Sequence, residues 1–243
     1  MAKIIVVTNQ KGGVGKSTVT MNLAAGLAKI KKAKVLVFDG DPQGTASRWA
    51  ASASDELPYP ANVVGLSHHG EKAHKEVAKF AKDYDYILVD CPPAVENNFT
   101  DSVLLIADLA IVPIVPSPAD LWAAVGIRKL ITNVQALNED LQARLVANMC
   151  QPNTKMSTEA VSIIDDFGIK KLNVNLHLRT IYRKSTALGC SVLDLEDEKA
   201  ALETTKLTKE ILNILKKKET FNAEVVNEIN QHKSTRTYLM KIG

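Results

Sequence analysis

The sequence has few cysteines and little net charge. Its three cysteines, Cys91, Cys150 and Cys190, are far apart and form no CxxC pair, so neither a disulfide framework nor a zinc site is indicated. Lysine and arginine (30) exceed aspartate and glutamate (27) by only three residues. Any contact with nucleic acid must therefore come from a local basic patch rather than from the overall charge.

Long apolar runs and targeting segments are also lacking. The first apolar run is short and leads directly into a glycine-rich loop, so we expect neither a signal peptide nor a transmembrane span. With 243 residues, of which 46% are hydrophobic and 23% charged, the chain can form one large α/β domain with a sizeable core. The sparse cysteines fit an intracellular, reducing compartment.

What the sequence does contain is a glycine-rich loop between a strand and a helix. A short β-branched run over residues 4–8 precedes the loop, and an Ala/Leu-rich helical segment over residues 19–28 follows it. Such a loop turns successive N–H groups inward around a phosphate, and the start of the helix adds unpaired N–H groups and a positive dipole end. The residues expected to bind a nucleotide here are Gly12, Gly13, Val14, Gly15, Lys16, Ser17 and Thr18.

Two side chains give this loop its chemistry. The Lys16 ammonium is expected on the β- and γ-phosphates, and the Ser17 hydroxyl is expected to bind Mg²⁺. The alternative is a glycine-rich turn that binds nothing. The loop, the lysine and the serine occur together between a strand and a helix, and this context speaks against that alternative.

The loop departs from the usual G-x-x-x-x-G-K-[ST] pattern. Gln10 stands where the first glycine is expected, and a second lysine, Lys11, precedes the glycine pair. The arrangement K-G-G-x-G-K-[ST] resembles the deviant Walker A motif of the ParA/MinD family of dimerising ATPases. The resemblance implies that Lys11 reaches across a dimer interface to the partner's nucleotide and takes part in catalysis. Taken alone, Lys11 would be interpreted as a solvated loop lysine.

Carboxylates follow two of the expected strands. Asp39 and Asp41 come directly after the apolar run over residues 34–38, and Asp90 closes the run over residues 86–89 in the manner of a Walker B strand. Asp90 is therefore expected to hold Mg²⁺, through a water or together with Ser17. The D-x-D-P-Q segment also resembles the family's, which implies that Asp41 orients the attacking water and that Asp39 supports the magnesium shell. Without the glycine loop nearby, an Asp-rich turn that caps the next helix would be the preferred interpretation.

Two further segments carry roles that the resemblance implies. Asn148 ends an apolar strand over residues 144–149, and the family places an adenine-contacting Asn there; turn chemistry is the alternative. The R-x-x-Y-R pattern after the last expected strand is similar to that of the smaller ParA proteins. It implies nonspecific DNA binding by Arg179, Arg183 and Lys184, whereas an ordinary cationic surface is the alternative.

Strands separated by helices predict a doubly wound α/β fold of the P-loop NTPase type. We expect a mostly parallel sheet with helices on both faces and the ligand at the carboxyl ends of the strands. The resemblance covers residues 1–218, the expected ATPase domain, and leaves 219–243 as a C-terminal helix and tail. Because no helix-turn-helix domain precedes the strand at Ile4, a small ParA-type protein is expected.

The expected function is that of a Mg²⁺-dependent ATPase that positions a cargo. ATP and Mg²⁺ would close a homodimer, the dimer would bind nonspecific DNA, and a ParB-like or adaptor partner would stimulate hydrolysis. The cargo would be a plasmid, a chromosome region or a protein organelle, and the protein would be cytoplasmic and nucleoid-associated, without stable membrane association. One alternative is a MinD-like membrane ATPase, for which the apolar and basic segment over residues 238–242 is short. The other is a P-loop metabolic ligase of the dethiobiotin synthetase type.

Overall fold

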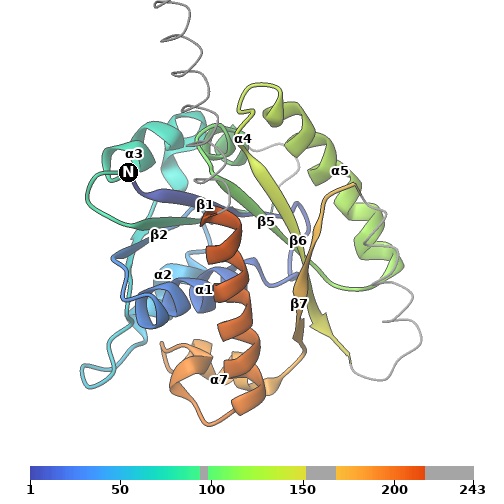
Figure 1. Cartoon of the computed structure of the whole chain (residues 1–243). Coiled ribbons are helices and arrows are strands. Elements are labelled where there is room, and N and C mark those ends of the chain that lie inside the picture. The colour runs from blue at the N-terminus through green and yellow to red at the C-terminus, as the bar shows by residue number, and fades with distance from the viewer. Residues whose placement is uncertain (94–97, 152–167, 217–243) are drawn as a thin grey trace, which may run out of the picture.

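The strands of the protein form one parallel sheet (Figure 1). The computed structural model describes residues 1–93, 98–151 and 168–216. Within them the sheet has seven strands in the order β3-β2-β4-β1-β5-β6-β7, and each neighbouring pair is parallel. The strands are β1 (Lys3–Val7), β2 (Val35–Asp39), β3 (Asn62–Gly65), β4 (Tyr86–Asp90), β5 (Leu109–Ile114), β6 (Gln142–Cys150) and β7 (Lys171–His177).

Helices cover both faces of this sheet, because the strands are apolar on both sides. In β1, Ile4 and Val6 pack into one core cluster while Ile5 and Val7 pack into the other, as the two-residue period of a strand requires. The first cluster is completed by α3 (Ala73–Lys79), α4 (Asn98–Leu104) and α5 (Pro118–Gln135). The second is completed by α1 (Lys16–Ile30), α2 (Thr45–Ala51) and the helix over residues 198–216.

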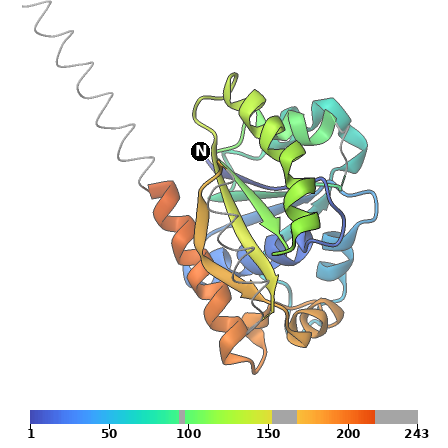
Figure 2. The ribbon, with the colours of Figure 1, turned by 90° about the vertical axis from the view of Figure 1, so that its right-hand side faces the viewer.

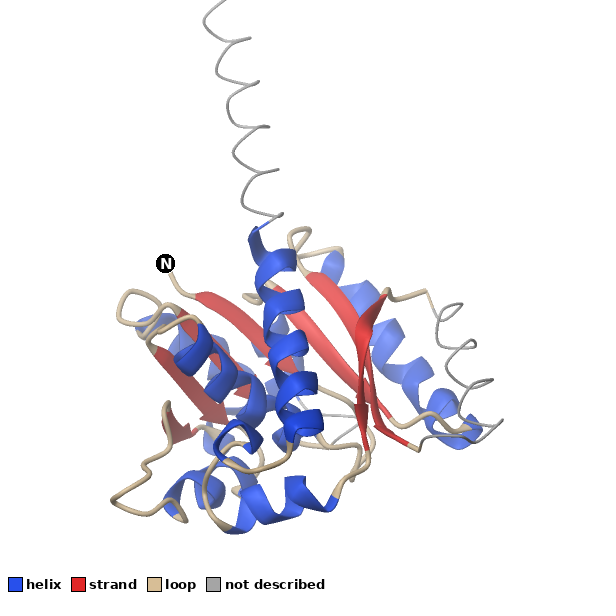
Figure 3. Cartoon of the chain, turned by 60° about the horizontal axis from the view of Figure 1, so that its bottom comes forward, coloured by secondary structure: helices blue, strands red, loops and turns tan. Residues whose placement is uncertain are grey.

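The helix over residues 198–216 lies beside the edge strand β7 (Figure 3). Glu210 accepts hydrogen bonds from the backbone N–H groups of Asn173 (2.8 Å) and Val174 (3.2 Å), and Glu203 accepts one from that of His177 (3.1 Å). These carboxylates therefore satisfy backbone donors that an edge strand would otherwise leave open. No helix in the described part of the chain is long and apolar enough to cross a membrane.

Short elements connect β7 to this helix and β3 to α3. They are α7 (Thr180–Ala187) and the 3-10 turns η2 (Val192–Asp194) and η1 (Ser67–Lys72). In a view turned by 90°, α7 lies at the end of the sheet where the arrow of β6 ends (Figure 2). The predicted doubly wound α/β fold is confirmed, and the sheet is parallel throughout its described strands. The expected helix and tail over residues 219–243 lie outside the described residues.

Candidate nucleotide-binding site

The predicted site residues meet at the carboxyl ends of β1, β2 and β4. In the parallel register, Val7 at the end of β1 pairs with Asp90 of β4, and Asp90 pairs in turn with Asp39 of β2. The glycine loop that leaves β1 therefore lies beside two buried carboxylates. This is the edge at which open α/β sheets bind their ligands.

The loop itself has the backbone shape of an anion-binding nest. Gly13 (φ 77°) and Gly15 (φ 88°) have left-handed conformations, and Gly15 is the N-cap of α1. Lys16, the first residue of α1, is buried, and its ammonium donates a 3.1 Å hydrogen bond to the carbonyl of Lys11 across the loop. Burial lowers the pKa of Lys16, which Asp90, Cys91 and Asp41 partly offset.

Asn148 supports this loop from β6. Its side-chain amide nitrogen donates a 2.8 Å hydrogen bond to the carbonyl of Val14, and the side chain is buried. A Cβ atom added to Gly15 would overlap this amide. The predicted strand over residues 144–149 thus brings Asn148 to the site, and the structure gives its amide a role in holding the loop. Its contact with adenine stays a prediction.

Asp90 offers one unused oxygen to the site. Its Oδ1 accepts a 3.2 Å hydrogen bond from the Thr20 hydroxyl, whereas its buried Oδ2 has no hydrogen-bond partner in the described residues. Burial raises the pKa of Asp90 to about 7, and Asp39 adds to the rise, while Ser17, Lys16 and Thr20 oppose it. A buried carboxylate oxygen without a partner is a good ligand for a hard cation such as Mg²⁺.

Asp39 and Asp41 differ in burial and in the number of hydrogen bonds that their carboxylates accept. Asp39 is buried, and its carboxylate accepts hydrogen bonds from the backbone N–H (2.8 Å) and hydroxyl (2.9 Å) of Ser47 and from the backbone N–H of Asp41 (3.2 Å). It therefore holds the first turn of α2 through Ser47, the third residue of the helix, whereas the N-cap itself is Gly44. Asp41 is half-buried, accepts a 2.9 Å hydrogen bond from Gln43, and lies close enough to raise the pKa of Lys16.

Cys91, directly after Asp90, has no activated thiol. The side chain is buried, and burial raises the pKa of the thiol to about 12. A thiolate is the form that acts as a nucleophile, so this cysteine is a small packing residue beside the site.

The comparisons with known proteins agree with this geometry. The family described as the CobQ/CobB/MinD/ParA nucleotide binding domain matches residues 5–189. The chain belongs to this family. It is 30% identical over 210 residues to the "Maintenance of carboxysome distribution protein A" of Halothiobacillus neapolitanus, and the match covers 86% of this chain and 95% of that protein.

Solved structures share the fold at lower identity. The ATP complex of a Cyanothece McdA variant, in which an aspartate is replaced by alanine, superposes with a TM-score of 0.74 at 15% identity, covering 86% of this chain and 96% of that one. The Mg-ADP complex of the septum site-determining protein MinD from Pyrococcus horikoshii gives 0.67 at 20% identity, covering 87% and 96%. The predicted resemblance to the ParA/MinD family is thereby confirmed.

In this ParA/MinD-family chain, α5 contacts the loop at two points that the sequence analysis missed. The Lys11 ammonium lies 2.6 Å from a carboxylate oxygen of Asp120, and Gln10 packs so closely on Gly126 that a Cβ there would overlap the Gln10 amide oxygen. The residue that breaks the usual loop pattern, Gln10, thus has a partner in α5. No local sequence signal marks either contact, because α5 is far from the loop in sequence.

The three predicted DNA-binding residues fall into two groups. Arg183 and Lys184 are exposed on α7. The Arg179 guanidinium instead donates a 2.7 Å hydrogen bond to Glu203 and forms an ion pair with it, which raises the pKa of Arg179. Arg179 is therefore balanced within the chain, and Arg183 and Lys184 are the cations that α7 presents to solvent.

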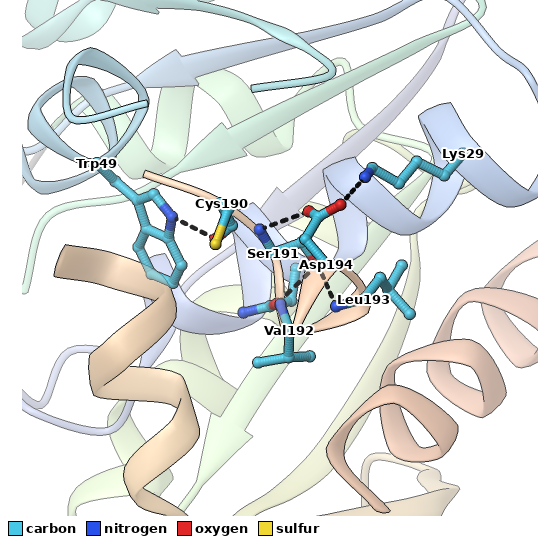
Figure 4. A network of polar contacts seen from close by, with 8 residues as sticks. Lys29, Trp49, Cys190, Ser191, Val192, Leu193 and Asp194 are labelled. Carbon is cyan, nitrogen blue, oxygen red and sulfur yellow. Dashed lines mark hydrogen bonds and ion pairs between the residues drawn. The ribbon is translucent and has the colours of Figure 1, made fainter. Parts of the chain in front are cut away.

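A polar clamp fixes the segment after α7 to the helices that begin at the site (Figure 4). The Trp49 indole of α2 donates a 2.9 Å hydrogen bond to the carbonyl of Cys190. Lys29 of α1 forms an ion pair with Asp194. The Asn22 side-chain oxygen, also on α1, accepts from the Ser191 hydroxyl (3.1 Å) and the Val192 backbone N–H (3.0 Å). The clamp thus holds the segment that follows α7 against α1 and α2.

Proposed function

We propose that this protein is a Mg²⁺-dependent ATPase that positions a cargo by closing an ATP-bound homodimer on nonspecific DNA. The observation that carries the proposal is the glycine nest beside the Asp90 oxygen that has no hydrogen-bond partner in the described residues. The match to a carboxysome distribution protein, which covers 86% of this chain and 95% of that protein, supports it. ATP and Mg²⁺ are supported by relatives of this fold that were crystallised with ATP and with Mg-ADP.

The described residues fit a magnesium-bound nucleotide. Phosphates would lie in the nest of loop N–H groups, against Lys16 and the start of α1. Ser17 and the Asp90 oxygen that has no hydrogen-bond partner in the described residues would hold Mg²⁺. Asp39, held by its hydrogen bonds to Ser47, would support the magnesium shell. When bound, this ion would neutralise charge on the β- and γ-phosphates.

Hydrolysis needs a group that orients a water near the γ-phosphate. Asp41 suits this role, because it is half-buried and near Lys16 and has fewer protein hydrogen bonds than Asp39. Lys11 would add a second positive charge to the nucleotide of the partner subunit.

Asp41→Ala should retain ATP and accumulate as a dimer, because the phosphate contacts remain. Lys16→Ala should lose ATP binding, and Lys11→Ala should bind ATP as a monomer but fail to dimerise.

The DNA contact is assigned to α7. One copy presents Arg183 and Lys184, and a symmetric dimer would present two such pairs on one assembly. Each neutralised phosphate adds about 0.9 to the salt slope of duplex binding, so doubling the contacts turns weak binding into useful binding. ATP-driven dimerisation would therefore switch DNA binding on, and a partner that stimulates hydrolysis would switch it off. Such a protein would be found in the cytoplasm on the nucleoid.

The test is sedimentation of the full chain with plain DNA and with anionic liposomes, each with and without ATP. We expect ATP-dependent pelleting with DNA that weakens steeply as salt rises. Arg183→Glu should abolish it and leave ATP-dependent dimerisation intact. Lys75→Glu, the same charge reversal at an exposed position of α3, is the control and should bind like the wild type. If the wild type pellets with liposomes and not with DNA, a MinD-like membrane ATPase replaces the proposal.

A further inference from the structure

Lys11, the loop lysine proposed to reach the nucleotide of a second subunit, forms an ion pair within its own subunit. The Lys11 ammonium lies 2.6 Å from an oxygen of Asp120, the third residue of α5. The Asp120 side chain is only 10% exposed, whereas the Lys11 side chain is 40% exposed. The carboxylate is thus the buried half of the pair, and the lysine is the half that can leave.

Asp120 is held rigidly at the start of α5. Ser117 is the N-cap of this helix, and its hydroxyl accepts a 3.2 Å hydrogen bond from the Asp120 backbone N–H while donating to the Asp120 carboxylate. The positive end of the helix dipole also favours a negative charge at this position. The carboxylate is therefore preorganised for a cation, unlike a flexible surface acid.

The backbone of Lys11 is fixed as well. Its N–H donates a 3.0 Å hydrogen bond to the Asn9 side chain, and Asn9 donates a 2.8 Å hydrogen bond to the Pro113 carbonyl of β5. One residue before, Gln10 packs against Gly126 of α5. The backbone at Lys11 is therefore fixed, and only its side chain can move from Asp120 to another anion.

We propose that Asp120 is a positioning residue that keeps Lys11 inside its own subunit until an ATP-bound partner offers a stronger anion. This inference rests on the proposed function, in which Lys11 acts on the partner's nucleotide. When Lys11 leaves, Asp120 stays nearly buried with an uncompensated charge, which opposes dimer closure. A triphosphate carries more negative charge than a diphosphate, so ATP overcomes this opposition better than ADP. The pair would thus make dimerisation selective for ATP.

The first arm of the test examines the pair in the nucleotide-free monomer. Lysine acylation followed by peptide mapping measures how fast each amine reacts. Asp120→Asn keeps an oxygen for the Ser117 hydroxyl but removes the charge that holds Lys11. Lys11 should then be acylated several-fold faster than in the wild type, while Lys129, an exposed lysine of α5, should react at an unchanged rate. Equal Lys11 rates in the two proteins would overturn the inference, whatever the protein does with ATP.

The second arm measures the dimer dissociation constant by analytical ultracentrifugation, with a non-hydrolysable ATP analogue and with ADP. Asp120→Asn should tighten the ATP-analogue dimer by about threefold to tenfold and should allow dimers with ADP. Asp83→Asn removes one charge from an exposed site at the other end of the sheet and should match the wild type. A dimer that is unchanged or weaker in Asp120→Asn overturns the inference. A wild type that stays monomeric with the analogue, despite a positive first arm, overturns the proposed function.

Discussion

The side-chain amide of Asn148 occupies the space that a side chain at Gly15 would need. Asn148 is buried and donates a 2.8 Å hydrogen bond to the Val14 carbonyl, so it cannot easily move away. Gly15 also has a φ of 88°, which L side chains rarely adopt. Strain and overlap therefore coincide at one residue of the loop.

The first prediction is a graded loss of stability along the loop. Gly15→Ala should lower the free energy of unfolding by more than about 2 kcal/mol, because it combines backbone strain with overlap. Gly13→Ala should cost about 1 kcal/mol, because its φ is 77° but no heavy atom lies within 4 Å of an added Cβ. Gly12→Ala, with only the Pro93 Cβ at 3.9 Å, should change little. Urea unfolding without nucleotide measures all three. Equal losses at Gly13 and Gly15 would contradict the role given to Asn148.

The second prediction separates the two roles of Asn148. Asn148→Ala removes the hydrogen bond that the side chain donates to the Val14 carbonyl. Because this bond supports the phosphate loop, its loss should affect every ligand that carries phosphates, whichever nucleobase the ligand has. If loop support dominates, calorimetry should find that ATP, GTP and inorganic triphosphate all bind more weakly, by about fivefold to thirtyfold. If the adenine contact that the family resemblance implies dominates, only ATP should lose affinity. We expect the first outcome.

Much of the fold could be predicted because its strands are buried on both faces. Residues 4–8 and 86–89 are nearly continuous apolar runs, and the sequence placed a phosphate loop after one and an acid after the other. Parallel pairing then brings Asp39 and Asp90 together without any further information. The expectation that these residues form one site followed from the rule that ligands bind at the carboxyl ends of parallel strands.

Contacts between distant segments could not be predicted in this way. No pattern in the sequence singles out Asp120, because only the packing of α5 beside the loop brings its carboxylate to Lys11. Arg179 was assigned to DNA on the family pattern, yet Glu203, on the following helix, balances its charge. A single sequence contains no periodicity that links such pairs, because their spacing is set by tertiary structure.

The third prediction concerns the pH dependence of the metal-free protein. Burial raises the pKa of Asp90 to about 7, above its ordinary value of 3.8. Between these values the folded state holds a proton that the unfolded state has released. The free energy of unfolding should therefore fall as pH rises, by roughly 3 kcal/mol between about pH 5 and pH 8 from this residue.

Asp90→Asn isolates this effect from other titrating groups. The amide can still accept from Thr20 but does not titrate, so the difference in stability between the variant and the wild type should grow with pH and level off above about pH 8. Urea unfolding in EDTA across this range measures the difference. A constant difference would show that Asp90 is already ionised in the folded metal-free protein.

The last prediction concerns the polar clamp that holds the segment after α7. Trp49→Phe keeps the aromatic ring in the core but leaves the Cys190 carbonyl without its indole donor, so it should cost about 1–3 kcal/mol of stability. Lys29→Met breaks the ion pair with Asp194, but Lys29 is 34% exposed and solvent screens the pair, so the cost should be about 1 kcal/mol or less.

If α7 binds DNA, Trp49→Phe should also weaken DNA binding more than ATP binding, because α1 and the loop keep their other contacts. Calorimetry measures the affinity for ATP, and a DNA-binding assay at fixed salt measures the affinity for DNA. Equal losses for ATP and DNA would mean that the clamp supports the whole fold rather than the placement of α7.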